Sequence, residues 1–175
     1  DPIKWISHDK RLLIGTSGGE YTLGATTSAE AMTPTNVSHP EQQSGQGSKA
    51  IPPVKTGLGH LYVERGGRKV NELVYSWEKD RLVTVDMTRL AEHITAGGVT
   101  EIAFQKRPEP MLWCVTANGN LATLIYLREE DVVCWHEHTT DGYFESVAVI
   151  PGDEEDEVWF VVRRTINSVT KRYVE

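Results

Sequence analysis

The sequence lacks a long apolar run, clustered cysteines and an excess of positive charge. A membrane-spanning helix needs about twenty consecutive apolar residues, and none of the 175 residues belongs to such a run. The two cysteines, Cys114 and Cys134, lack Cys-x-x-Cys spacing, which argues against a zinc knuckle or a disulfide framework. Each cysteine lies in an apolar strand-like run, so we predict that both are small buried side chains.

The charge balance disfavours a surface that holds nucleic acid tightly. The formal net charge is −7, whereas strong binding to phosphate groups requires concentrated Lys and Arg. Transient, non-specific passage of DNA along such a surface is compatible with this charge. The sequence indicates no cofactor, no small-molecule substrate and no contact with a membrane.

The size and composition are those of one globular domain, which we place at residues 1–175. The hydrophobic content of 39% is sufficient for a core. The chain begins with Asp1-Pro2, without an initiator Met or a signal peptide, and ends in strand-like Tyr173-Val174-Glu175. We therefore expect it to be a piece of a longer polypeptide.

A repeated pattern is the main positive signal. An alternating apolar run with an aromatic residue is followed by a polar turn and a second alternating run. The aromatic anchors lie roughly 45 to 57 residues apart, a spacing in the range of propeller blades. They are Trp5, Tyr62, Trp113 and Trp159. We expect all four to pack in the core between repeats.

The repeats predict an all-β fold, a β-propeller-like array of antiparallel meanders with about four blade-like units and one short helix over 88–96. The third unit has four predicted strands, and the fourth has three and lacks its last. The first unit lacks an opening strand before Trp5. Both end units are thus incomplete, either because the chain belongs to a larger propeller or because its two ends complete one sheet. The predicted strands of the last two units are 100–105, 111–116, 121–127 and 132–138, then 144–150, 158–163 and 169–174.

Residues 25–59 interrupt the repeat pattern with Thr, Ser, Pro, Gln and Gly. A structureless stretch of this length is uncommon inside a compact domain unless it is functional or disordered. We predict a long exposed excursion within the domain, which could be ordered by a partner.

The sequence contains only weak residue patterns for a metal site or a catalytic site. His136 and His138 would share one face of a strand, and with Asp141, Glu145 or His93 they could in principle hold a metal ion. Polar residues on the outer face of a sheet explain them equally well. The sequence therefore favours a protein that is not an enzyme, with no catalytic, cofactor-binding or metal-binding residues.

Two groups of residues are candidates for an interface. Arg65, Arg68 and Lys69 surround Gly66-Gly67 and form a compact basic cluster at a predicted hairpin turn. Trp77 and Trp135 fall outside the register of the anchor aromatics, and Trp is enriched at interfaces. A solvated turn and ordinary packing remain the alternatives.

Several segments resemble a family of bacteriophage virion proteins, the tail nozzle or tail-tube proteins of short-tailed phages, which also occur in prophages. The resemblance covers nearly the whole chain and preserves the order of the motifs. The segments are LLIGTSGGE (12–20), EAMTPTN (30–36), RGGRKV (65–70), LAEHI (90–94), WCV (113–115), WHEHTTDG (135–142) and FESVAVIPG (144–152).

The resemblance implies a β-propeller-like region and a structural role in the virion. It implies a non-enzymatic tail component, made in the bacterial cytoplasm, that assembles with other tail subunits, including copies of itself in a ring, around a DNA exit channel. The stretch 41–48 departs from the family pattern, since an extended strand is expected there. The alternative function is a propeller-type binding module that recognises a protein or a glycan through the 25–59 loop.

Overall fold

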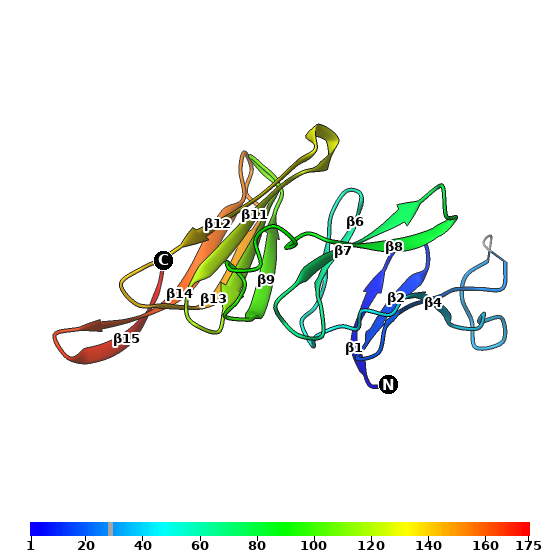
Figure 1. Ribbon diagram of the computed structural model, residues 1–175, viewed down its shortest axis with the longest axis horizontal. Helices are drawn as coiled ribbons and strands as arrows, with labels where there is room; N and C mark the ends of the chain where they lie inside the picture. The colour runs from blue at the N-terminus through cyan, green and yellow to red at the C-terminus, as the bar shows by residue number, and fades with distance from the viewer. Residues whose placement is uncertain (28–29) are drawn as a thin grey trace.

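The computed structural model describes residues 1–27 and 30–175 and shows an all-β protein (Figure 1). The described residues form four antiparallel sheets and a single short 3₁₀ turn, η1 (Arg128–Glu130). No helix within these residues is long and apolar enough to cross a membrane.

Each sheet is built from strands that follow one another along the chain. Sheet 1 contains β1 (Ile3–His8), β2 (Leu12–Thr16), β3 (Glu20–Leu23) and β4 (Glu41–Ser44). Sheet 2 contains β5 (Val54–Lys55), β6 (Gly59–Val63), β7 (Val70–Ser76) and β8 (Arg81–Asp86). Sheet 3 contains β9 (Val99–Gln105), β10 (Met111–Thr116), β11 (Leu121–Leu127) and β12 (Val132–His138). Sheet 4 contains β13 (Tyr143–Ile150), β14 (Glu157–Ile166) and β15 (Val169–Val174).

The predicted meanders of the last two units are confirmed. Sheet 3 has the order β12-β11-β10-β9, and sheet 4 has the three-stranded order β13-β14-β15. The prediction that the first unit is incomplete is wrong, because β4 pairs with β3 and gives sheet 1 four strands. The two ends of the chain do not complete one sheet, since β1 and β15 belong to different sheets and lie in opposite halves of the molecule (Figure 1).

The predicted excursion over 25–59 is exposed only in part. Most described residues from Thr26 to Gln42 are exposed, and Ser28 and Ala29 lie outside the described residues. The later part is ordered within the fold, because Ser48 is fully buried and Ile51 belongs to the core. Short strands form here without alternating apolar residues, since their backbone groups pair with neighbouring strands.

The predicted helix over 88–96 is absent. The segment forms consecutive turns in which the amide of Ala91 donates to the carbonyl of Thr88 and the amide of Ile94 donates to the carbonyl of Ala91. Leu90, within this segment, is 96% exposed. One turn packs Ala91 and Ile94 against the core without the i to i−4 bonds of an α-helix.

Consecutive sheets share hydrophobic clusters. Trp5 and Leu13 of sheet 1 pack with Tyr62 and Leu73 of sheet 2. The largest cluster joins sheets 2 and 3, and a third cluster joins sheets 3 and 4 around Val147. The core is thus divided among successive sheet-to-sheet contacts.

The four aromatic anchors differ in their surroundings. Trp5 and Tyr62 are buried, with ring centroids 5.8 Å apart. Trp113 is half-buried, and its ring centroid lies 5.5 Å from that of Phe160. The expectation that Trp159 packs in the core is wrong, since this side chain is 41% exposed.

The two cysteines also differ. Cys114 is buried as predicted, and burial raises the pKa of its thiol. The same prediction is wrong for Cys134, which is exposed because it lies on edge strand β12.

Candidate functional site

The predicted basic turn connects β6 to β7 at the junction of sheets 2 and 3. The amide of Gly67 donates to the carbonyl of Glu64 over 2.8 Å, and the amide of Gly66 donates to the Glu64 carboxylate over 3.0 Å. Gly67 has a φ angle of 77°, a conformation that favours glycine. The Gly-Gly pair therefore positions the charged residues on either side of the turn.

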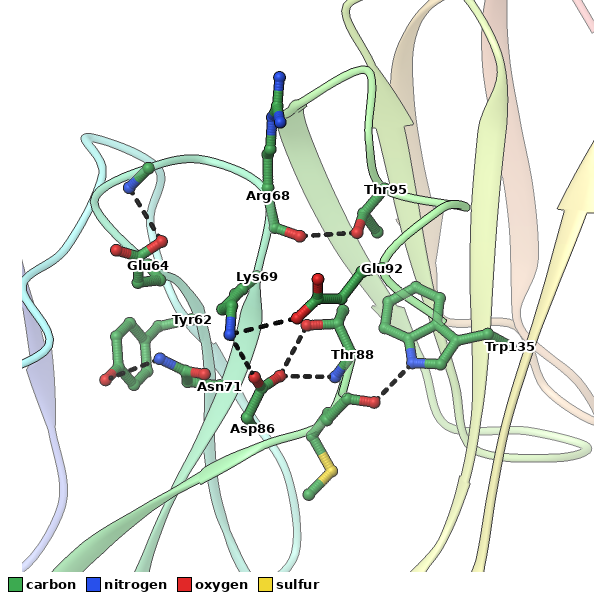
Figure 2. A network of polar contacts seen from close by, with 12 residues as sticks. Tyr62, Glu64, Arg68, Lys69, Asn71, Asp86, Thr88, Glu92, Thr95 and Trp135 are labelled. Atoms are coloured by element: carbon green, nitrogen blue, oxygen red, sulfur yellow. Dashed lines mark hydrogen bonds and ion pairs between the residues drawn. The ribbon is translucent and has the colours of Figure 1, made fainter. Parts of the chain in front are cut away.

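Lys69 lies in a polar network rather than on a free surface (Figure 2). Its Nζ atom lies 2.9 Å from Asp86 Oδ2 and 3.3 Å from Glu92 Oε1. Asp86 also accepts hydrogen bonds from the amide and the hydroxyl of Thr88, at 2.9 and 2.7 Å. Burial opposes ionisation of Asp86, but the bonds from Lys69 and Thr88 outweigh it and lower the pKa of this carboxyl. The network stabilises the connection between β8 and β9.

The two arginines of the turn have different surroundings. Arg65 Nη1 donates to the carbonyl of Ser17, in the turn between β2 and β3, over 3.4 Å. The carbonyl of Arg68 accepts from the hydroxyl of Thr95 over 2.6 Å, while its exposed side chain points away from the network (Figure 2). The three basic residues are neighbours in the sequence, but their charged groups have different surroundings. Arg65 contacts a backbone carbonyl and Lys69 pairs with two carboxylates, whereas the exposed guanidinium of Arg68 points outward (Figure 2).

The two tryptophans proposed for an interface are also separated. Trp135 on β12 donates from Nε1 to the carbonyl of Met87 over 2.8 Å and packs against the core (Figure 2). Trp77, in the turn between β7 and β8, is 87% exposed. Its ring meets that of Tyr75 edge to face, with centroids 5.1 Å apart. Trp135 thus joins two sheets within the chain, and Trp77 presents an aromatic surface to solvent.

The histidines form no metal centre within the described part of the chain. His136 and His138 lie side by side on β12, with ring centroids 4.7 Å apart. No group of three potential His, Cys, Asp or Glu ligands is close enough to hold a metal ion among the described residues. Burial, and then the neighbouring His136, lower the pKa of His138. Packing of the His138 ring against Trp113, at 5.6 Å between centroids, explains its position.

A buried charged group that the sequence analysis missed lies between sheets 2 and 3. Glu72 on β7 is fully buried, and its carboxylate accepts a hydrogen bond from the hydroxyl of Tyr126. Arg128 Nη2 lies 3.1 Å from Glu72 Oε2. Tyr126 and Arg128 line a cavity of about 590 Å³ whose wall also includes Leu58 and Phe104. The signal in the sequence was an acidic residue at an inward position of an alternating strand.

Among the described residues, no sheet packs on the outer face of sheet 1 or of sheet 4, the first and last in the sheet succession. On sheet 4, Val158 and Phe160 face sheet 3, so the alternation of β14 turns Trp159 to the opposite face. Ile150 and Val174 share that face by register and are 52% and 69% exposed. These side chains form a patch for which the chain supplies no cover among its described residues.

The outer face of sheet 1 is also apolar. Trp5 and Leu13 face sheet 2, so Ile6 and its cross-strand partner Ile14 lie on the opposite face. Ile6 is 57% exposed. Tyr21 pairs with Ile14 and extends this face across β3.

Comparison with protein-family models gave no match, and comparison with curated proteins gave no significant relative. The geometry and the motifs of the chain therefore carry the functional argument.

Proposed function

We propose that the chain is a non-enzymatic structural component of a bacteriophage tail that assembles with other tail subunits around a DNA exit channel. The observation that carries this proposal is the succession of sheets that pack face to face and end in two uncovered apolar faces. Such faces are typical of surfaces that bind other protein subunits. The resemblance of the motifs to tail nozzle proteins gives the assembly its proposed identity.

The propeller-like arrangement is part of the proposal. Each sheet is an up-and-down meander, and each shares a hydrophobic cluster with the next sheet along the chain. Propeller blades are sheets of this kind packed around an axis. The four sheets would then be successive blades.

The charge of the chain supports passage of DNA rather than its retention. At a net charge of −7, a channel wall built from this surface would hold phosphate groups weakly. Arg68 projects from its turn as a positive point, but Lys69 is neutralised by Asp86 and Glu92. Rapid movement of DNA through a channel requires weak contacts of this kind.

Negative-stain electron microscopy, with mass determination in solution, tests the assembly. The tail function predicts rings with a central opening. A protein that stays monomeric at high concentration, alone and with other tail proteins of the same phage, would contradict it.

Two charge substitutions test the role of the end faces. Ile6→Lys alters sheet 1 and Trp159→Lys alters sheet 4, and both side chains are exposed enough for the fold to tolerate Lys. If the outer face of sheet 4 in one copy docks on the outer face of sheet 1 in the next, each variant alone remains monomeric. Their equimolar mixture then forms a dimer and nothing larger, because one intact face of each kind remains. Assembly of either variant alone beyond the monomer would show that its altered face is not needed.

A second candidate function, a binding module that acts through the 25–59 region, is favoured by one observation. A groove of about 460 Å³ between edge strands β4 and β8 is lined by Gln42 to Gln46, Lys79 and Arg81 to Thr84. Tyr75 on β7 is the cross-strand partner of Leu82, one of the residues that line this groove, and its ring meets that of the exposed Trp77 edge to face. Amide groups beside aromatic rings suit a glycan, because hydroxyls bind the amides and sugar rings pack on aromatic faces. Saturable glycan binding that is lost in Trp77→Ala would support this function.

A further inference from the structure

The groove between β4 and β8 has a positively charged wall. Lys79 and Arg81 line it from the β7–β8 turn and the start of β8, and both are exposed. The described residues along the groove include no acid. Within the described part of the chain, no carboxylate lies at ion-pair distance from either cation. On a chain with a net charge of −7, two neighbouring cations without a counter-ion favour an anionic ligand.

Gln43 joins the two walls of the groove. Its Oε1 accepts a hydrogen bond from the amide of Leu82 over 3.1 Å, and its Nε2 donates to the hydroxyl of Thr22 over 3.0 Å. The amide of Leu82 on edge strand β8 is therefore already paired, and an added strand could not use it. This arrangement favours a ligand held by side chains over a strand that extends the sheet.

Exposed amide side chains lie along the opposite wall. Gln42 and Gln46 line the groove from β4 and the loop that follows it, and both are exposed. A primary amide supplies two N–H donors and a carbonyl acceptor, which match the hydroxyl groups of a sugar. The nearby acid Glu41 pairs with Arg11 at 2.7 Å and does not line the groove. This wall therefore offers hydrogen bonds without negative charge.

Two aromatic rings lie at the β7–β8 turn. Leu73 and Leu82 pack toward sheet 1, and alternation along β7 places Tyr75 on the same face as Leu73. The ring of Tyr75 meets that of Trp77 edge to face, and its hydroxyl donates to Asp80. Trp77 is 87% exposed, so its ring is accessible to the apolar face of a sugar.

We propose that this groove binds an acidic glycan, an oligosaccharide that carries a carboxylate group. Lys79 and Arg81 bind the carboxylate through charge-assisted hydrogen bonds. The amides of Gln42 and Gln46 bind hydroxyl groups, and Trp77 packs against a sugar ring. This inference rests on the second candidate function, the binding module, and adds to it the class of glycan that is bound.

Matched pairs of acidic and neutral glycans test the proposal by nuclear magnetic resonance titration of the 175-residue chain. The first pair is trigalacturonic acid and its fully methyl-esterified form, and the second is sialyllactose and lactose. At least one acidic glycan should shift the amide signals of Gln42, Gln46 and Arg81. It should bind roughly fivefold more tightly than its neutral partner, as expected for ion pairs exposed to solvent. Salt at about 1 M should remove most of this difference.

Charge substitutions assign the preference to the groove. The double variant Lys79→Gln with Arg81→Gln should lower the affinity for the acidic glycan to that of its neutral partner. Arg89→Gln is the matched control and should leave the preference unchanged. Arg89 is also exposed and, among the described residues, has no carboxylate at ion-pair distance, but it does not line this groove. Trp77→Ala should weaken both members of a pair.

The outcomes separate the class of glycan from glycan binding itself. Equal affinity within both pairs would overturn the acidic class and leave the binding-module function standing. An acidic preference that survives the double substitution would show that Lys79 and Arg81 do not bind the carboxylate. Absence of binding by all four glycans at millimolar concentration, or signal changes centred away from the groove, would overturn both the inference and the function on which it rests.

Discussion

Tyr126 on β11 donates a hydrogen bond from its hydroxyl to Glu72 on β7, and this bond joins sheet 3 to sheet 2 across a fully buried carboxylate. Burial, and then the bond to Glu72, raise the pKa of Tyr126 to about 12, so the phenol remains a donor at neutral pH. Arg128, at 3.1 Å, places a positive charge beside the same carboxylate. The junction between these sheets thus contains a buried carboxylate whose partners come from β11 and from η1, the turn that follows it.

Arg128→Met should lower the free energy of unfolding by roughly 3 kcal/mol, because it leaves Glu72 as an uncompensated buried charge. Denaturant unfolding monitored by Trp fluorescence measures this difference. The control is the double variant Glu72→Gln with Arg128→Met, which removes both charges and should recover most of the loss. A double variant as unstable as Arg128→Met would show that packing of the Arg128 stem, rather than its charge, is what matters.

Trp113→Ala should destabilise the protein far more than Trp159→Ala, although both residues occupy the anchor position of the repeat. Trp113 packs against Phe160 and donates from Nε1 to Gln105 over 3.1 Å, so its truncation should cost about 3 kcal/mol. Trp159 lies on the uncovered face, so in the monomer its loss should cost less than about 1 kcal/mol. Thermal melts of the two variants at low protein concentration measure the difference. Equal losses would mean that the outer face of sheet 4 is covered in solution.

These two tryptophans show why the repeat pattern predicted strands well and burial less well. Alternation and turn residues depend on neighbouring positions in the chain, and the strands of sheets 3 and 4 were predicted within one residue of their ends, except that β14 continues three residues beyond 163. Burial of Trp159 depends on whether another sheet covers its face. No local pattern contains that information.

Tertiary contacts explain the segments whose structure was predicted wrongly from the local sequence pattern. β4 (Glu41–Ser44) has polar side chains and no alternation, but the edge of β3 gives its backbone a partner. The helix expected over 88–96 is replaced by consecutive turns. The Asp86 carboxylate instead binds Thr88, and Leu90 remains in solvent. The buried Glu72 was visible only as an acid at an inward position of an alternating strand, since its partners lie far along the chain.

Glu20→Gln should change the dependence of stability on pH. Burial raises the pKa of Glu20 above its ordinary value of 4.5, although Ser48 donates a hydrogen bond to its carboxylate over 2.8 Å. The folded state therefore binds a proton more tightly than the unfolded state. The stability that this proton provides is fully present below pH 4.5 and is lost as pH rises through the raised pKa.

Denaturant unfolding between pH 4 and pH 8 measures this effect. The unaltered protein should lose stability across the window above 4.5, while Glu20→Gln should lack this decline. The two proteins should be most similar at the acid end. Parallel curves over the whole range would mean that Glu20 is ionised in the fold and that a bound cation or water compensates its charge.

Asp86→Ala should weaken the protein most at neutral pH and less in strong acid, where the protonated carboxyl of Asp86 no longer pairs with Lys69 but can still accept a hydrogen bond from Thr88. The ionised Asp86 carboxylate accepts two hydrogen bonds from Thr88 and pairs with Lys69 at 2.9 Å. Since the pKa of Asp86 lies below its ordinary value of 3.8, the part of its contribution that depends on the ionised carboxylate is present above pH 3.8 and is lost as pH falls through the lowered pKa. We expect a loss of roughly 2 kcal/mol at pH 7, most of it from the buried amide of Thr88 left without an acceptor.

Asp86→Asn separates the hydrogen bonds from the ion pair. Its amide oxygen can still accept from Thr88, so only the partly exposed pair with Lys69 is lost, which is worth less than about 1 kcal/mol because solvent screens it. High salt should abolish the small deficit of Asp86→Asn and leave most of the larger deficit of Asp86→Ala. Equal deficits in the two variants would mean that the charge of Asp86, and not its acceptor atoms, stabilises the turn between β8 and β9.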